Sequence, residues 1–242
     1  ITLEGSQGNS FNTIAASGEN ATVLHYEDNN GELKKDSLML FDLGSLYNNY
    51  GSDISRTYPI SGKFSERQKT IYEIVLKANK ESIKFAKPGK TWKELNSFAK
   101  DILIKECKKI GLIKDDVEIS KYYFHSIGHF LGLDTHDVGQ YDLEFSEGMV
   151  ITIEPGLYIK DEKIGIRIED NILITKDGTK NLSKKIIKEV SGFGTSVNAS
   201  EMSDEGMYDF FGSLDDYFRI SPEHAEILGW EVIGFPIRSE ER

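Results

Sequence analysis

Cysteine, proline and long apolar runs are scarce in this chain of 242 residues, which has one cysteine and five prolines. The single cysteine, Cys107, cannot form an intrachain disulfide, so a disulfide framework is excluded and a reducing, cytoplasmic compartment is expected. The sequence contains no apolar run of about 18 residues and no secretory leader pattern. We therefore expect no membrane partner.

Positive charge is also in short supply. Lysine and arginine total 29 against 40 aspartate and glutamate residues, which gives a formal net charge of −11. An acidic chain opposes the phosphate contacts that bind nucleic acids, so no nucleic-acid partner is expected. Apolar residues make up 38% of the chain, enough for the core of one sizeable domain.

Strand patterns surround two helix patterns in the first 190 residues. Short apolar runs between turn residues predict strands at residues 13–16, 21–26, 37–42 and 54–58. An apolar period of about 3.6 residues predicts a helix over 66–85 with Ser65 as N-cap. The sequence Thr91-Trp-Lys-Glu94 predicts a capping box for a second helix through Cys107, packed against the first as a hairpin. Further strands are predicted at residues 136–139, 148–154, 156–159, 164–169 and 171–175.

The two groups of strands resemble each other. Residues 37–44 and 148–156 each form an apolar strand that ends in an acid, Asp42 or Glu154, followed after one residue by glycine. A histidine precedes each acid at a similar distance, 17 residues in the first group and 18 in the second. This repeat predicts a pseudo-twofold domain with a site where its halves meet.

The repeat also has a consequence for the helices. The helix pair at 66–111 belongs to the second half, so the first half should have an equivalent pair. We expect that pair before residue 1, outside this chain.

Residues 191–242 differ in character from residues 1–190, which we interpret as one domain. Residues 191–196 are linker-like, and the segment after them is acidic and rich in aromatic residues. Its aromatic content is too high for plain disorder. The segment is interpreted as a small appended module, a segment docked on the main domain, or a partner-binding arm.

Five residues of the two strand groups form a candidate metal-ligand set: Asp42, Asp53, His129, Glu154 and Glu169. Each has an ordinary structural explanation when taken singly, but five such residues in one repeat are hard to reach by chance. Four carboxylates and one imidazole exceed what a single structural zinc needs, and they lack its thiolates. Bridging carboxylates are what two divalent ions about 3.5–4 Å apart require.

An oxygen-rich set of ligands favours Mn²⁺, with Fe²⁺, Co²⁺ or Zn²⁺ as alternatives. The chemistry expected of two such ions is hydrolysis by a metal-bridged hydroxide. No nucleophilic serine or cysteine is then required.

Ordered motifs along the chain carry a family resemblance: Gly18-Glu-Asn, Leu24-His25-Tyr26, Asp42-Leu-Gly44, Gly51-Ser-Asp53-Ile-Ser-Arg-Thr57, His125-Ser-Ile-Gly-His129, Asp134-Thr-His136-Asp-Val-Gly139, Thr152-Ile-Glu154-Pro-Gly-Leu-Tyr158 and Gly165-Ile-Arg-Ile-Glu169-Asp170. With these motifs, residues 9–187 resemble the catalytic domain of the aminopeptidase P and prolidase family, proline-directed metallopeptidases. The resemblance implies the α+β pita-bread fold for residues 1–190 and a pair of manganese ions.

Applied residue by residue, the resemblance implies a role for each candidate ligand. Asp42 would bind one metal ion, and His129 and Glu154 would bind the other. Asp53 and Glu169 would bridge the pair.

The resemblance also implies catalytic roles. Three histidines match the family's substrate histidines, which would orient the scissile carbonyl and the proline ring and stabilise the oxyanion: His25, His125 and His136. Glu154 is the candidate general base and proton carrier. Arg167 and Tyr158 match outer positions that would hold Asp42 and shuttle protons.

The function that the resemblance implies is removal of an N-terminal residue that precedes proline, from a peptide with proline at position 2. Prolidase activity on Xaa-Pro dipeptides is the alternative within the family, whose members also form homo-oligomers. Methionine aminopeptidase shares the fold but is less similar around residues 125–139. A non-catalytic peptide-binding domain of the same fold is the alternative from another class, although such domains have lost the ligands.

Overall fold

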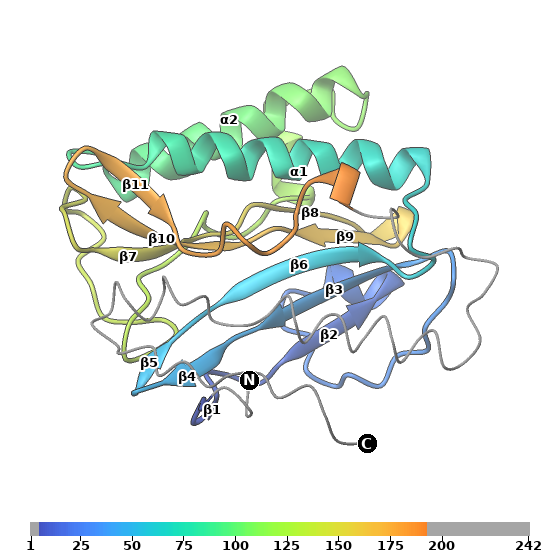
Figure 1. The fold of residues 1–242 in the computed structure, drawn as a ribbon. Coiled ribbons are helices and arrows are strands. Elements are labelled where there is room, and N and C mark those ends of the chain that lie inside the picture. The colour runs from blue at the N-terminus through green and yellow to red at the C-terminus, as the bar shows by residue number, and fades with distance from the viewer. Residues whose placement is uncertain (1–4, 193–242) are drawn as a thin grey trace.

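Antiparallel strands form the body of the fold, and two long helices lie together along one side of them (Figure 1). The computed structural model describes residues 5–192. Its strands are β1 (Gly8–Asn9), β2 (Ile14–Ser17), β3 (Leu38–Leu43), β4 (Ser45–Tyr47), β5 (Tyr50–Gly51), β6 (Ile54–Pro59), β7 (Val150–Ile153), β8 (Gly156–Ile159), β9 (Ile164–Arg167), β10 (Asp170–Thr175) and β11 (Gly178–Asn181). Its helices are α1 (Glu66–Phe85) and α2 (Trp92–Lys109), with short 3-10 helices at Gly18–Thr22, Asp116–Lys121, Lys160–Glu162 and Val190–Gly192. The predicted α+β class is confirmed.

Both predicted α-helices begin at the predicted capping residues. At α1 the Gln68 N–H donates to Ser65 Oγ over 3.2 Å, and the Ser65 N–H donates back to Gln68 Oε1 over 2.9 Å. At α2 the same reciprocal pair joins Thr91 and Glu94, at 3.2 and 3.0 Å. These bonds satisfy N–H groups that no helical carbonyl can reach, and each cap contributes about 1 kcal/mol.

The helices bury their apolar faces against strands of the second half. One cluster joins both helices to β8 and β9 through buried residues that include Ile71, Leu103 and Ile166. A second cluster packs the start of α2, at Trp92, on β7 and β10. Burial of this many aliphatic side chains, at about 25 cal/mol per Å² of apolar surface, supplies the main driving force for the fold.

Strand pairing follows the predicted repeat. In the first half β3 pairs with β6 and β4 with β5, and in the second half β7 pairs with β10 and β8 with β9. All four pairs are antiparallel, and the outer pair of each half encloses the inner pair in sequence. In residues 5–192 the α1–α2 pair lies on the second half, and no equivalent pair covers β2, β3 and β6 (Figure 1).

Two strand predictions are wrong. Residues 21–26 do not form a strand, because Gly18 turns the chain at a positive φ of 57° into a 3-10 helix that the Val23 N–H closes on the Asn20 carbonyl. Residues 136–139 form a loop, in which the Asp137 N–H returns to the Phe130 carbonyl over 3.0 Å. Val138 is the one apolar side chain in that stretch and is 87% exposed, so nothing drives it into a sheet.

Residues 193–242 lie outside the described residues, so the predicted C-terminal segment is described only at residues 191 and 192. In the described part of the chain, neither helix is long and apolar enough to cross a membrane.

Candidate metal centre

A cavity of about 310 Å³ lies where the two halves of the repeat meet. Its walls are formed by Leu24, His25, Asp42, Asp53, His125, Ser126, Gly128, His129, His136, Tyr141, Glu154, Arg167 and Glu169. All five candidate ligands and the three candidate substrate histidines are among them. Of the predicted site residues only Tyr158 is not part of the wall, and it contacts two residues that are.

The strand ends bring the four carboxylates together. Asp42 is near the end of β3 and Asp53 precedes β6, its antiparallel partner. Glu154 follows β7 and Glu169 precedes β10 in the same way. Because antiparallel partners place the end of one strand beside the start of the next, each half supplies two acids at one edge.

Backbone hydrogen bonds join the two halves at this edge. The Glu169 N–H donates to the Ser55 carbonyl over 3.0 Å, and the Asp53 N–H donates to Asn171 Oδ1 over the same distance. The Asn171 amide in turn donates to the Asp53 carbonyl. The positions of Asp53 and Glu169 are therefore set by contacts between the halves.

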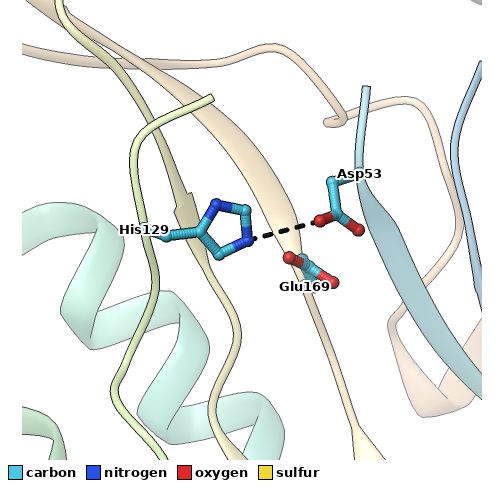
Figure 2. A group of neighbouring side chains, drawn as sticks. All are labelled: Asp53, His129 and Glu169. Carbon is cyan, nitrogen blue, oxygen red and sulfur yellow. Dashed lines mark ion pairs between the residues drawn. The ribbon is translucent and has the colours of Figure 1, made fainter. Parts of the chain in front are cut away.

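His129 points its Nε2 atom at the carboxylates (Figure 2). This atom lies 3.3 Å from Asp53 Oδ2 and 3.6 Å from Glu154 Oε1. Its Nδ1 atom lies 2.9 Å from the Phe130 carbonyl, which can only accept, so the ring proton belongs on Nδ1. Burial lowers the pKa of His129 to about 4 and keeps the ring neutral near pH 7. An unprotonated Nε2 facing carboxylates is the arrangement that a shared cation requires.

Three of the four carboxylates each have one oxygen atom without a hydrogen bond in the described part of the chain. In residues 5–192 no hydrogen bond reaches the buried atoms Asp42 Oδ1, Asp53 Oδ1 and Glu169 Oε1. Burial raises the pKa of Asp53 and of Glu169 well above the usual range, and the neighbouring acids raise both further. Burial also raises the pKa of Glu154, to about 7. Buried acids that raise one another's pKa and keep oxygen atoms without a donor fit a divalent cation, and ligand atoms of Asp53, His129 and Glu169 all lie within 4.8 Å of one another.

Arg167 orders acids from both halves. Its Nη2 lies 2.7 Å from Asp42 Oδ2, and its Nε donates to Ser55 Oγ over 2.7 Å. The Ser55 hydroxyl then donates to Glu169 Oε2, also over 2.7 Å. The contact between Arg167 and Asp42 that the sequence predicted is present. The second oxygen of each acid, Asp42 Oδ1 and Glu169 Oε1, has no hydrogen bond in residues 5–192.

Tyr158 connects this arginine to a cavity histidine. Arg167 Nη1 donates to Tyr158 Oη over 3.1 Å, and the same oxygen lies 2.9 Å from His125 Nε2. His125 Nδ1 lies 2.7 Å from the Ser126 carbonyl, so the tyrosine hydroxyl is the donor to Nε2. Burial lowers the pKa of His125 to about 4. Asp42, Arg167, Tyr158 and His125 form one continuous hydrogen-bonded chain.

The remaining histidines are more exposed. His136 lies in the loop between the 3-10 helix Asp116–Lys121 and β7. Its ring centroid is 4.1 Å from that of His129. His25 follows the first 3-10 helix, and both side chains are exposed at the cavity wall. The two lie where an incoming molecule would meet them before it reaches the buried acids.

Sequence reasoning missed several residues of the site. Ser55 bridges Arg167 and Glu169, and Thr152 Oγ1 accepts from the His129 N–H over 3.1 Å and donates to Glu154 Oε1 over 3.4 Å. Ser55 is two residues after Asp53 and Thr152 is two before Glu154. Since side chains two apart share a face of a strand, this period could have identified both. Tyr141, at the cavity wall, has no comparable signal.

We expect the stability of the metal-free protein to fall as pH rises from about 6 to 7, the latter being the pKa of folded Glu154. Unfolded Asp and Glu lose their protons near pH 4, whereas folded Asp53 and Glu169 keep theirs to higher pH. The free energy of unfolding then falls by about 1.4 kcal/mol per pH unit for each proton retained. The lowered pKa values of His125 and His129 act in the opposite direction, but only below about pH 6.5.

Urea denaturation in a chelator across this pH range measures the effect. Repeating the series with Mn²⁺ should abolish the fall, because a bound cation replaces the retained protons. Metal-free stability that rises between pH 6 and 7 would contradict a cluster of buried acids with raised pKa values.

Known proteins are similar in sequence to this chain over most of its length. Residues 1–176 match the description of metallopeptidase family M24. The chain is 40% identical over 208 residues to an Xaa-Pro aminopeptidase of Haemophilus influenzae, a match that covers 78% of this chain and 48% of that protein. It is 43% identical over 186 residues to an Xaa-Pro dipeptidase of Pyrococcus furiosus, covering 75% and 50%. The chain thus spans about half the length of these relatives.

The fold has the same likeness. A solved structure from Bacillus anthracis, assigned to aminopeptidase P, superimposes with a TM-score of 0.78 at 58% sequence identity. The match covers 79% of this chain and 46% of that one. The predicted pita-bread fold is confirmed.

Proposed function

Because this chain belongs to metallopeptidase family M24, we propose that it holds a two-metal peptidase site that releases an N-terminal residue preceding proline. The observation that carries the proposal is the convergence of four carboxylates and His129 on one cavity, with buried oxygens that receive no hydrogen bond in residues 5–192. The Xaa-Pro activity of the relatives gives the substrate class. A peptide with proline at position 2 is the proposed partner.

Five residues would hold the cations: Asp42, Asp53, His129, Glu154 and Glu169. Two divalent ions supply Lewis acidity, which makes a nucleophile of water at neutral pH and polarises the scissile carbonyl. Carboxylate oxygens in the majority favour Mn²⁺ over softer ions, although Zn²⁺, Co²⁺ and Fe²⁺ accept the same set. The chain's own residues then bind, orient and exchange protons with the substrate.

Glu154 is the proposed proton carrier. Its carboxylate faces the cavity beside His129 and can take a proton from the attacking water and pass it to the leaving nitrogen of proline. Thr152 Oγ1, which donates to Glu154 Oε1, orients the carboxylate for this transfer. Arg167 Nη2, 2.7 Å from Asp42 Oδ2, holds that carboxylate at the cavity wall.

The histidines are proposed to handle the substrate. His125 is proposed to transfer its Nδ1–H from the Ser126 carbonyl to the scissile carbonyl oxygen as negative charge develops there, while the Tyr158 hydroxyl, held by Arg167, donates to its Nε2. His25 and His136, which are exposed, would line the path of the peptide and the proline ring. Homo-oligomerisation and a cytoplasmic location stay predictions from the sequence.

The full chain, supplied with Mn²⁺, should release the first residue from an Xaa-Pro-Xaa tripeptide. A matched Xaa-Ala-Xaa tripeptide is the control, and it should be cut far more slowly. Chromatography of the released amino acid provides the measurement. Absence of release from a folded chain with metal bound would refute the proposed reaction.

A prolidase reaction is the second candidate, because identity to the Pyrococcus furiosus dipeptidase is as high as that to the aminopeptidase. A series from Xaa-Pro to longer proline peptides separates the two. Aminopeptidase activity predicts cleavage that persists as the peptide lengthens, whereas a dipeptidase would cleave Xaa-Pro alone.

A further inference from the structure

Asn79 is a fully buried asparagine in the middle of α1, on the face that packs against the strands. Its Nδ2 donates two hydrogen bonds, to the Ile153 carbonyl over 3.0 Å and to the Ile168 carbonyl over 3.1 Å. Its Oδ1 accepts from Lys188 Nζ over 2.7 Å. All the polar atoms of this amide are therefore used.

The orientation of the Asn79 amide is fixed by its partners. Backbone carbonyls only accept and a lysine ammonium only donates, so exchange of the amide oxygen and nitrogen would break all three bonds. A buried amide satisfied in one orientation only is a rigid element, because each lost bond leaves a buried group unpaired at about 1–3 kcal/mol.

Both carbonyls belong to residues that immediately precede candidate ligands. Ile153 ends β7 just before Glu154, and Ile168 lies between β9 and β10 just before Glu169. At these two positions the strands are interrupted. One side chain thus ties together the two backbone segments that carry Glu154 and Glu169.

A buried ion pair secures the other side of Glu169. Lys188 Nζ also contacts Asp170 Oδ2, and Asp170 Oδ1 lies 2.7 Å from Arg56 Nη2. Arg56 Nη1 donates to the Glu169 carbonyl. The side chains of Arg56 and Asp170 are fully buried and that of Lys188 is 12% exposed, so the network from α1 to β6 is largely shielded from solvent.

We propose that Asn79 is a positioning residue that sets the separation of Glu154 and Glu169, and through it the affinity of the site for divalent ions. The inference rests on the proposed function, since it concerns the same metal site. Asn79 acts through the backbone and touches neither the cavity wall nor a reacting atom. Partners behind a metal ligand typically change metal affinity by 10–100-fold when replaced.

Titration calorimetry of the full chain with Mn²⁺ alone tests this inference. Asn79→Leu, which keeps the side-chain volume and removes all three hydrogen bonds, should weaken Mn²⁺ binding about 10–100-fold. Ser82→Ala is the matched control, because Ser82 lies on the same helix, is fully buried, and has a hydroxyl without a hydrogen-bond partner in residues 5–192. It should bind Mn²⁺ as the unmodified chain does.

Circular dichroism and melting in a chelator establish that the variants fold. If Asn79→Leu does not fold, Lys188→Met is the second variant, since it keeps both donations from Asn79 and removes the group that orients the amide, together with the Lys188 contact to Asp170. It should weaken Mn²⁺ binding by a smaller factor. A folded Asn79→Leu, or a folded Lys188→Met in its place, with unchanged Mn²⁺ affinity would overturn the inference and leave the proposed function standing. An unmodified chain that binds no Mn²⁺ would overturn both.

Discussion

Replacement of Glu154 by glutamine should reduce the rate of Xaa-Pro cleavage by about 10²–10⁴-fold, the range for loss of a positioned general base. The amide keeps the shape of the side chain but can neither take a proton nor contribute a negative charge to the cations. Glu154 Oε1 lies 3.6 Å from His129 Nε2 at the cavity wall, so both losses fall at the proposed site. Release of the first residue from an Xaa-Pro-Xaa peptide at saturating Mn²⁺ measures the rate.

Glu147→Gln is the matched control for this change. Glu147 is exposed in the turn before β7, seven residues from Glu154, and its replacement by glutamine removes the same negative charge. It should leave the rate within about twofold, because an exposed carboxylate outside the cavity interacts weakly through solvent. Equal rates for the two variants would show that Glu154 carries no proton in the reaction.

Replacement of Arg56 by methionine should lower the free energy of unfolding by about 3–5 kcal/mol, because it leaves Asp170 with only part of its compensation in a buried site. The Arg56 and Asp170 side chains are both 0% exposed, and their charged atoms are 2.7 Å apart. The carbonyls of Ser55 and Glu169 also lose a donor. Urea denaturation in a chelator measures the loss without a contribution from bound metal.

Arg67→Met provides the comparison. Arg67 makes an equally short, two-pronged contact with Glu162, at 2.6 and 2.7 Å, but the side chains are 39% and 32% exposed. Solvent screens such a pair, so its loss should change stability by less than about 1 kcal/mol. If the two arginine variants lost the same stability, burial would not explain the contribution of the Arg56–Asp170 pair to the free energy of unfolding.

Local sequence signals were sufficient for the helices and for the strands that end in acids. Ser65 and Thr91 predicted where α1 and α2 begin, because a capping box is formed by residues three apart in the sequence. Asp42 and Glu154 were found because each ends an apolar strand in the same pattern. The repeat then predicted that they meet, and they do so at the cavity wall.

Signals were absent where tertiary contacts decide the conformation. The hairpin of β4 and β5 turns through Asn48 and Asn49 at positive φ values of 47° and 64°, and its two short strands were not predicted. The loop that carries His136 was predicted as a strand, although its shape follows from bonds to Phe130. The role of Asn79 was not predicted, because a polar residue on an apolar helix face can be interpreted only when its hydrogen-bond partners elsewhere in the fold are known.

The roles of the five candidate ligands are the central claim, and a direct count of bound metal tests it. The full chain is equilibrated with Mn²⁺, freed of excess ion, and analysed by mass spectrometry for metal per chain. The account predicts two manganese ions per chain, and loss of bound metal in His129→Ala, which removes the imidazole that faces Asp53 and Glu154. A folded chain that retains no stoichiometric manganese, zinc, cobalt or iron would contradict it and would favour a binding domain of the same fold.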